Sequence, residues 1–323
     1  MKIATIGTSW ITDSFIKSSE YISDARICAV YSRDISKAEK FAAEHNVIDY
    51  YDSLDEMLSN DKIDGVYIAS PNYAHYEQAK KCLEAGKHVI CEKPATVTKK
   101  QLENLYALAD SKNLIFLEAM KSMHSDGLGI ILDEIKNIGD VRTAHIDFSQ
   151  LSSKYPAYKR GENPNIFNPE LCTGALMDLG VYCVYFALEL FGKPVNVVAS
   201  SAFLESGADY SGTLVFEYED KTVTITYSKV ANGFVPSKIL GEDGAVTVKS
   251  VSKLTGISRY YNDGTIKELY PTVDENLVMS KEIDAFIKFA KGENSDHYAY
   301  CKQISLDVCA IMEKIRTENK FGF

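Results

Sequence analysis

The first third of the chain alternates short apolar runs with segments of helical periodicity. Apolar runs rich in Val, Ile and aromatic residues predict strands at residues 3–6, 27–31, 65–70, 89–91 and 114–117. Helical patterns lie between several of them, at residues 36–44, 76–84 and 99–111. A repeated strand–helix order predicts right-handed crossovers, and therefore a parallel sheet covered by helices on both faces.

The pattern changes after Met120. A predicted helix at 128–136 and a strand at 141–148 are followed by a loop rich in Pro, Asn and Gly at 152–173 and by a helix at 174–191. Further runs of β-branched and aromatic residues, separated by turn residues, predict a mostly antiparallel sheet with strands at 195–204, 211–218, 222–229 and 245–249. Helices at 275–291 and 301–317 close the chain.

These patterns predict an α/β protein of two domains. Residues 1–120 form the parallel-sheet domain, and residues 121–323 form an α+β domain. A length of 323 residues agrees with two domains, because one hydrophobic core rarely grows so large. With no low-complexity linker between them, we expect the domains to pack together around a ligand crevice.

Charge and composition narrow the possible partners. Acidic residues outnumber basic ones by 45 to 35, the net charge is −10, and no Lys/Arg-rich run exists, which argues against nucleic acid. The first residues reach Gly7 too early for a signal peptide, and no apolar run approaches a membrane span, so a cytoplasmic location is expected. Seven cysteines without a C-x-x-C pair and six scattered histidines predict reduced thiols and no metal site.

The first strand ends in a partial dinucleotide-binding fingerprint. Residues Gly7, Thr8, Ser9, Trp10 and Ile11 stand where G-x-G-x-x-G begins, but only the first glycine is present. That glycine would make the tight turn, and the following residues would approach the pyrophosphate. An ordinary turn between strand and helix is the alternative.

The end of the second strand bears on the choice of cofactor. An acidic residue there would bind the ribose hydroxyl of NAD, but this chain has Ser32 and Arg33, with Lys37 on the next helix. A guanidinium fork suits a 2′-phosphate, which favours NADP over NAD. The alternative is a surface arginine at a helix start.

The fourth predicted element ends in Ser70-Pro71-Asn72, with His75 one helical turn later. Ligands of parallel sheets gather at the carboxyl ends of strands, so we expect Ser70, Pro71, Asn72 and His75 to contact the cofactor. A turn in which Asn72 caps the helix is the alternative. A histidine at this position is more often packed in a helix than catalytic.

Two further motifs supply chemistry. Glu92-Lys93-Pro94 follows the predicted strand at 89–91, where Lys93 can aim an ammonium at the crevice, although a bare Glu-Lys pair is usually solvated surface. Asp178 and Tyr182 stand four apart on a predicted helix, so they would share a face. They form either a structural hydrogen bond or a proton donor with its orienting carboxylate.

Together these motifs resemble the Gfo/Idh/MocA oxidoreductases. The resemblance spans nearly the whole chain, and its most specific part joins Glu92-Lys93-Pro94 to the later Asp178-x-x-x-Tyr182. Tyrosine in place of the more common histidine is similar to the branch of glucose–fructose oxidoreductase and dimeric dihydrodiol dehydrogenase. This implies a Rossmann domain, catalysis by Lys93, Asp178 and Tyr182, and a large open C-terminal sheet that makes a homodimer or homotetramer.

The resemblance also leaves differences. Ser9 replaces the second fingerprint glycine, and the segment 118–124 lacks the Trp and Arg that often follow Glu-Ala in that branch. We expect Lys121 and His124 in that segment to belong to the substrate pocket.

The resulting functional hypothesis is an enzyme that uses NADP, or NAD, to oxidise or reduce a hydroxyl or carbonyl carbon of a sugar, polyol or related small molecule. A dinucleotide-sensing regulatory protein of the same fold, without catalysis, is the rival. An enzyme that keeps its cofactor bound and alternates oxidation with reduction is a third possibility. The joint presence of Lys93, Asp178 and Tyr182 favours catalysis.

Overall fold

The computed structural model describes residues 1–319 and 321–323, and the chain forms two compact units. The first unit comprises Met1–Met120 and Asp274–Leu306, and the second comprises Lys121–Val273 and Asp307–Phe323. The segment Asp274–Leu306 thus returns to the first unit, whereas the sequence pattern had suggested a single boundary after residue 120.

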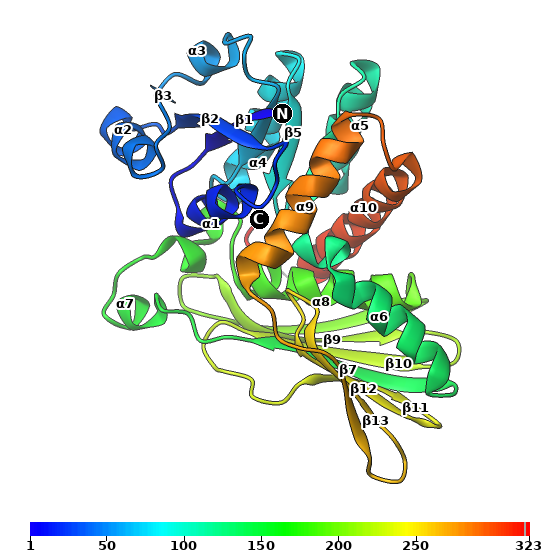
Figure 1. Ribbon diagram of the computed structural model, residues 1–323. Coiled ribbons are helices and arrows are strands. Elements are labelled where there is room, and N and C mark those ends of the chain that lie inside the picture. The colour runs from blue at the N-terminus through cyan, green and yellow to red at the C-terminus, as the bar shows by residue number, and fades with distance from the viewer. Residues whose placement is uncertain (320) are drawn as a thin grey trace. The chain divides into compact units, whose positions relative to one another are not determined.

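The first unit contains a six-stranded sheet in the order β3-β2-β1-β4-β5-β6, in which every pairing is parallel (Figure 1). Its strands are β1 (Lys2–Ile6), β2 (Arg26–Tyr31), β3 (Asp49–Tyr51), β4 (Gly65–Ile68), β5 (His88–Glu92) and β6 (Phe116–Ala119). The predicted parallel sheet is confirmed. Strand β3 was not predicted, because it has three residues and no buried one.

Helices accompany this sheet in the predicted alternation. They are α1 (Trp10–Ser19), α2 (Ile35–Glu44), α3 (Leu54–Leu58), α4 (Asn72–Glu84), α5 (Lys99–Ser111) and α9 (Glu275–Ala290). Helix α5 begins with a reciprocal capping box between Thr98 and Gln101, which satisfies two amides at its start. Helix α9 packs against α1, and α10 (Ser295–Glu318) continues from the first unit into the second.

The second unit contains an eight-stranded sheet in the order β14-β13-β12-β11-β7-β10-β9-β8. Its strands are β7 (Val141–Ser149), β8 (Asn196–Phe203), β9 (Asp209–Glu217), β10 (Thr222–Ser228), β11 (Ser237–Gly241), β12 (Gly244–Ser250), β13 (Thr255–Tyr260) and β14 (Ile266–Tyr270). Among the described strands, only the pair of β7 with β10 is parallel, which confirms the mostly antiparallel sheet.

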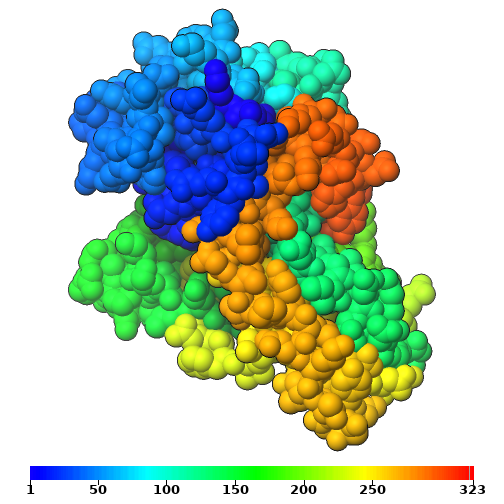
Figure 2. All heavy atoms as spheres, viewed as in Figure 1, coloured from blue at the N-terminus to red at the C-terminus, as the bar shows by residue number. Residues whose placement is uncertain are grey.

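Helices cover one face of this sheet. Helix α6 (Asp126–Glu134) packs against β13 and β14, and α8 (Val181–Phe191) packs against β7 and β10 (Figure 1). The short α7 (Tyr155–Lys159) lies within the predicted loop. The hairpin of β13 and β14, gold in Figure 2, lies at the surface, where β14 is an edge strand carrying Lys267 and Glu268. Charged residues on an edge strand oppose pairing with other chains.

One sequence expectation about membranes was wrong. The segment Pro169–Phe191 is long and apolar enough to span a membrane by length and composition, with a mean hydropathy of 1.6. However, 78% of the 18-residue stretch that meets this criterion is buried inside the protein, and α8 is a core helix. The apolar character of this segment is therefore explained by its packing on the sheet.

Candidate functional site

The turn after β1 can be made only by glycine. Gly7 has a φ of +112°, and a Cβ atom there would lie 2.6 Å from the carbonyl oxygen of Ala69, which follows β4. Its amide donates to the carbonyl oxygen of Tyr31 at 3.0 Å, at the end of β2. Gly7 therefore joins the carboxyl ends of three neighbouring strands, where ligands of parallel sheets bind.

Helix α1 begins immediately after this turn, at Trp10. Ser9 occupies the N-cap position in an extended conformation without a capping hydrogen bond, and its Oγ lies 3.5 Å from Oγ1 of Thr12. Trp10, the first helical residue, is 69% exposed. The first amides of a helix and its dipole favour an anion, so this start is suited to a phosphate.

Arg33 lies at the same edge of the sheet. Its Nη1 donates a hydrogen bond of 3.3 Å to the hydroxyl of Tyr73, so a side chain after β2 meets one in the first turn of α4. Both side chains are exposed. Tyr73 was not identified from the sequence, because only the fold brings it beside Arg33.

The neighbours of Arg33 have partners of their own. The carboxylate of Asp34 caps α2 by accepting from the amides of Ser36 and Lys37, and it lies 3.7 Å from the ammonium of Lys37. Ser32 donates its amide to the carbonyl oxygen of Tyr51 at 3.1 Å. In the described ion pairs, Lys37 lies beside Asp34, whereas no carboxylate pairs with the guanidinium of Arg33.

His75 connects the loops that follow β4 and β5. Its Nε2 lies 2.8 Å from the carbonyl oxygen of Ser70 and its Nδ1 lies 3.0 Å from that of Pro94, and the side chain is only 1% exposed. Burial lowers the pKa of the His75 imidazole, despite the two carbonyl partners. A neutral ring donates to one of these carbonyls at a time, so His75 braces two loops that carry predicted cofactor-binding residues.

The alternative role of Asn72 as a helix cap was wrong. Pro71 occupies the N-cap position of α4, and Asn72 is the first helical residue. The preceding Ser70 donates its hydroxyl to Oε1 of Gln78 at 2.6 Å. Contacts of Ser70, Pro71 and Asn72 with a cofactor remain a prediction.

The backbone on both sides of Lys93 is anchored. Tyr67, stacked on Phe15 with ring centroids 3.7 Å apart, donates its hydroxyl to Oε1 of Glu92 at 2.6 Å. On the other side, the amide of Ala95 donates to Oε1 of the buried Glu118 at 2.8 Å. These contacts fix the loop at the end of β5, and they were not anticipated because their partners are distant in sequence.

The sequence predicts that Asp178 and Tyr182 lie on one regular α-helix. The structure differs from this prediction. Asp178 lies in the π-helix Leu176–Gly180, and Tyr182 lies in the first turn of α8. A π-helix bonds i to i+5, so a spacing of four residues no longer guarantees a shared face. Tyr182 is 8% exposed, and its ring meets that of Phe148 of β7 edge-on, with centroids 5.7 Å apart.

An ion pair anchors Asp178 within the second unit. The ammonium of Lys229 bonds to Oδ2 of Asp178, and Lys229 is only 7% exposed. Lys229 follows β10 directly and was not identified from the sequence. A lysine at the end of a predicted strand was the only indication in the sequence. It did not reveal the partner, because Asp178 lies 51 residues earlier.

The start of the segment with Asp178 is fixed by a second carboxylate. Asp209 accepts from the amide of Leu176 at 2.7 Å and is 1% exposed. Its burial raises the pKa of the Asp209 carboxyl to about 7, while the amides of Leu176 and Ala175 oppose the shift. Asp209 was also missed by sequence reasoning.

Lys121 and His124 lie on a short helix that packs against α8, the helix that carries Tyr182. Lys121 is 6% exposed and is the first residue of a 3-10 helix that ends at His124. A role of these two residues in substrate binding remains a prediction. Lys93 belongs to the first unit, whereas Asp178 and Tyr182 belong to the second, so the meeting of all three also remains a prediction.

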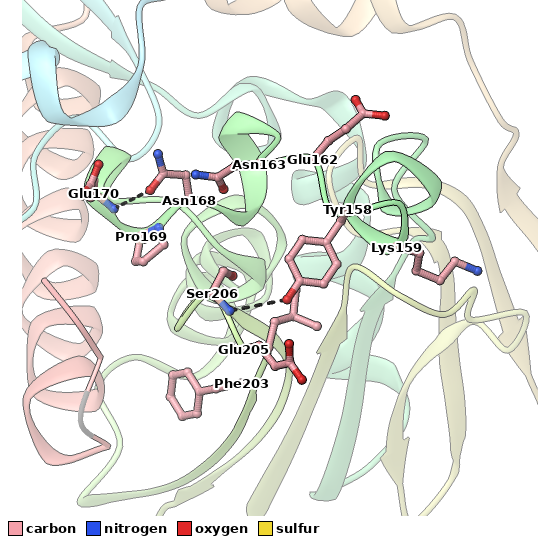
Figure 3. A pocket seen from close by; sticks show the side chains of 12 residues that line it. Tyr158, Lys159, Glu162, Asn163, Asn168, Pro169, Glu170, Phe203, Glu205 and Ser206 are labelled. Atoms are coloured by element: carbon pink, nitrogen blue, oxygen red, sulfur yellow. Dashed lines mark hydrogen bonds between the residues drawn. The ribbon is translucent and has the colours of Figure 1, made fainter.

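A separate hollow of about 890 Å³ lies within the second unit (Figure 3). Polar and apolar atoms share its wall about equally, and the hydroxyl of Tyr158 accepts from the amide of Ser206 at 3.4 Å. Asn168 closes another part of the wall by accepting from the amide of Glu170 at 3.1 Å. None of the predicted site residues lines this hollow.

Family models match both parts of the chain. Residues 1–120 match the oxidoreductase family with an NAD-binding Rossmann fold, and residues 134–247 match the GFO/IDH/MocA C-terminal domain. The chain belongs to the Gfo/Idh/MocA family of oxidoreductases, and the resemblance and the fold class predicted from its sequence are confirmed.

Similar proteins include curated relatives and solved structures. The scyllo-inositol 2-dehydrogenase (NADP(+)) IolU of Bacillus subtilis is 36% identical over 318 residues, which cover 98% of this chain and 97% of that protein. The human trans-1,2-dihydrobenzene-1,2-diol dehydrogenase is 31% identical over 202 residues, 61% of this chain and 58% of that protein. The 3-ketoreductase KijD10 from Actinomadura kijaniata, solved with NADP and TDP-benzene, has a TM-score of 0.86 at 20% identity and covers 98% of this chain and 97% of its own.

Proposed function

We propose that this protein is an NADP-dependent dehydrogenase or reductase that acts on a hydroxyl or carbonyl carbon of a polyol or sugar. The observation that carries the proposal is the likeness to the NADP-dependent inositol dehydrogenase, because it spans 98% of this chain. An inositol is a cyclic polyol, so a relative with that activity directs the search toward polyhydroxylated rings.

The carboxyl edge of the six-stranded sheet fits a nicotinamide dinucleotide. Residues 7–11 and the start of α1 would hold the pyrophosphate, and Arg33 with Ser32 would bind the 2′-phosphate of NADP. The loops that hold Ser70, Pro71, Asn72, Glu92 and Lys93, braced by His75, would line the remainder. When bound, the dinucleotide supplies the hydride chemistry.

The chain itself supplies the proton chemistry in this proposal. Tyr182 exchanges a proton with the substrate oxygen, and the ammonium of Lys93 helps to orient that oxygen. Asp178 orients the catalytic group, and Lys121 and His124 border the substrate. The anchored backbone around Lys93 supports this assignment, because catalytic side chains need a rigid frame.

We further propose a cytoplasmic homodimer or homotetramer assembled through the eight-stranded sheet. Buried and partly exposed residues alternate along β10, so one sheet face is packed and the other is available for another copy. No disulfide joins the seven cysteines in the described part of the chain, which agrees with a reducing compartment. Light scattering on the purified protein measures the oligomeric state, and a monomer at micromolar concentration would contradict the assembly.

A cofactor turnover assay tests the proposed activity. The purified protein is incubated with NADP⁺ or NADPH and a panel of inositols, sugars and their keto derivatives, and absorbance at the nicotinamide band is followed. Turnover with at least one polyol or sugar is expected. Tight cofactor binding without turnover across the panel would favour the dinucleotide-sensing alternative, and cofactor retained through purification would favour an enzyme that keeps it bound.

A further inference from the structure

A buried lysine supports the segment that carries Asp178. Lys229 bonds to the Asp178 carboxylate, whose side chain is 31% exposed, while the Lys229 side chain is 9% exposed. Ion pairs between lysine and aspartate are common on protein surfaces, but the ammonium of Lys229 is largely shielded from water. A buried charge is tolerated only when a partner compensates it, so the ammonium of Lys229 depends on Asp178.

The backbone of Lys229 is held on two sides. Its amide donates to the carbonyl oxygen of Tyr210, and its own carbonyl accepts from the amide of Ser152, both at 2.8 Å. The first partner belongs to β9 and the second to the loop after β7. The lysine is therefore fixed at its root, and its side chain reaches Asp178 from a rigid position.

Lys229 and Phe148, the residue that contacts Tyr182, lie at the same end of the parallel strand pair β7 and β10. In the register of β10 with β7, Tyr227 pairs with Phe148 and Ser228 pairs with Ser149, so Lys229 lies just beyond the paired ends. Phe148 is the residue that meets the ring of Tyr182. The π-helix also packs on β10, where a Cβ atom on Gly180 would lie 3.1 Å from the ring of Tyr227.

We propose that Lys229 is a positioning residue, which keeps the Asp178 carboxylate ionised and in one orientation at the junction that carries Tyr182. The proposal rests on the proposed function, because it acts through Asp178 and Tyr182. Removing the ammonium leaves a carboxylate with less compensation, and a lost opposite charge raises a carboxyl pKa by about 1–3 units. Asp178 would then take up a proton as the pH falls through a higher value than in the wild type.

Other titratable groups lie on this segment and on the elements packed against it. The Asp147 carboxylate on β7 accepts from the amide and hydroxyl of Ser149, and Asp209 of β9 holds the start of the π-helix. The others are Tyr182, Cys183, Tyr185, Glu189, Tyr210 and Tyr227. Asp147 and the exposed His145 alternate along β7 with Phe148, which meets Tyr182, so both lie on the opposite face of the sheet. A change caused by Lys229 through Asp178 must therefore be separated from these groups by a double-mutant cycle.

The chain offers a matched control at the opposite end of the same strand. Lys221 precedes β10 and forms an ion pair with Asp220, whereas Lys229 follows β10 and pairs with Asp178. The side chain of Lys221 is 17% exposed, so it too is mostly covered. The variants Lys221→Met and Lys229→Met thus delete the same group from two ends of one strand.

The experiment measures the pH profile of kcat/KM for wild type, Lys229→Met, Lys229→Arg, Lys221→Met, Asp178→Asn and the Lys229→Met/Asp178→Asn pair. Lys229→Met should move the acidic limb upward by about 1–3 pH units, as expected for losing the opposite charge beside a carboxyl group. Lys229→Arg should restore most of the profile, and Lys221→Met should match wild type. In the Asp178→Asn background, Lys229→Met should cause no further shift.

The outcomes separate this inference from the proposed function. If Tyr182→Phe and Asp178→Asn reduce turnover but the Lys229→Met profile equals the wild-type profile, the role of Lys229 is overturned and the proposed function stands. If Asp178→Asn matches wild type, Asp178 has no role in catalysis and the inference fails with it. Should Lys229→Met fail to fold, Lys229→Gln and the double variant, which removes both charges, provide the same comparison.

Discussion

A Cβ atom on Gly174 would lie 1.9 Å from Oδ1 of Asp209, so the space that any other side chain needs at this position is filled by a buried carboxylate. The same carboxylate accepts from the amide of Leu176 and so begins the helical segment that carries Asp178 and Tyr182. Gly174 and Asp209 therefore act together: the glycine leaves room for the acid that fixes the candidate catalytic segment.

Gly174→Ala should destabilise the protein more than a glycine substitution without this neighbour. Gly161→Ala is the matched control in the same unit, because Gly161 also has a positive φ, of 86°, but no atom lies within 4 Å of its Cβ position. Gly161→Ala reports the penalty of a positive φ without a clash. Gly174→Ala should lose about 1–3 kcal/mol more, through the clash with Asp209 and through a φ of 137° that alanine adopts less readily. Equal losses in urea unfolding would contradict the pairing of Gly174 with Asp209.

Glu189 should make the protein less stable as the pH rises. Burial raises the pKa of the Glu189 carboxyl from 4.5 to about 8, and neither of its oxygens has a hydrogen-bond partner among the described residues. The native state retains this proton where the unfolded chain has lost it, so stability falls as the pH rises from about 4.5 to about 8. The cost is about 1.4 kcal/mol for each unit of the shift.

Glu189→Gln should therefore flatten the loss of stability at neutral and alkaline pH. Denaturant unfolding at a series of pH values measures the effect, and Glu205→Gln, at an exposed position of the same unit, is the control. The control should keep the wild-type pH dependence. A Glu189→Gln protein whose stability falls with pH as steeply as wild type would show that this carboxyl does not titrate in the way its burial implies.

Arg33→Ala should weaken NADP⁺ much more than NAD⁺. A charge-assisted hydrogen bond is worth about 1.5–3 kcal/mol, or roughly a tenfold to hundredfold change in affinity. Arg26, at the opposite end of β2, provides the matched control, because Arg26→Ala removes the same group from the amino end of the strand. Titration of both cofactors measures the effect, and an unchanged ratio of the two affinities would remove Arg33 from the 2′-phosphate site.

The sequence was sufficient for elements whose pattern is local. The parallel sheet followed from alternating apolar runs and helices, and the confirmed family followed from residues such as Lys93 and Tyr182. Strands β11, β13 and β14 were not predicted, because polar residues interrupt them and pairing with neighbouring strands stabilises them.

The candidate site depends more strongly on distant contacts. The π-helix at Leu176–Gly180 follows a start fixed by Asp209, and Asp178 pairs with Lys229, two partners that no periodicity around residue 178 reveals. The brace formed by His75 likewise needs carbonyl groups from two different loops. Residue types were thus predictable, but the partners that position them required the fold.

Single-turnover hydride transfer with a confirmed polyol or sugar substrate tests the central claim most directly. Tyr182→Phe should slow this step by about 10²–10⁴, the usual effect of losing a general acid or base, and leave NADP⁺ affinity nearly unchanged. Tyr260→Phe, at an exposed position on β13, is the control and should match wild type. A Tyr182→Phe enzyme that transfers hydride at the wild-type rate would contradict the proposed catalytic role of the tyrosine.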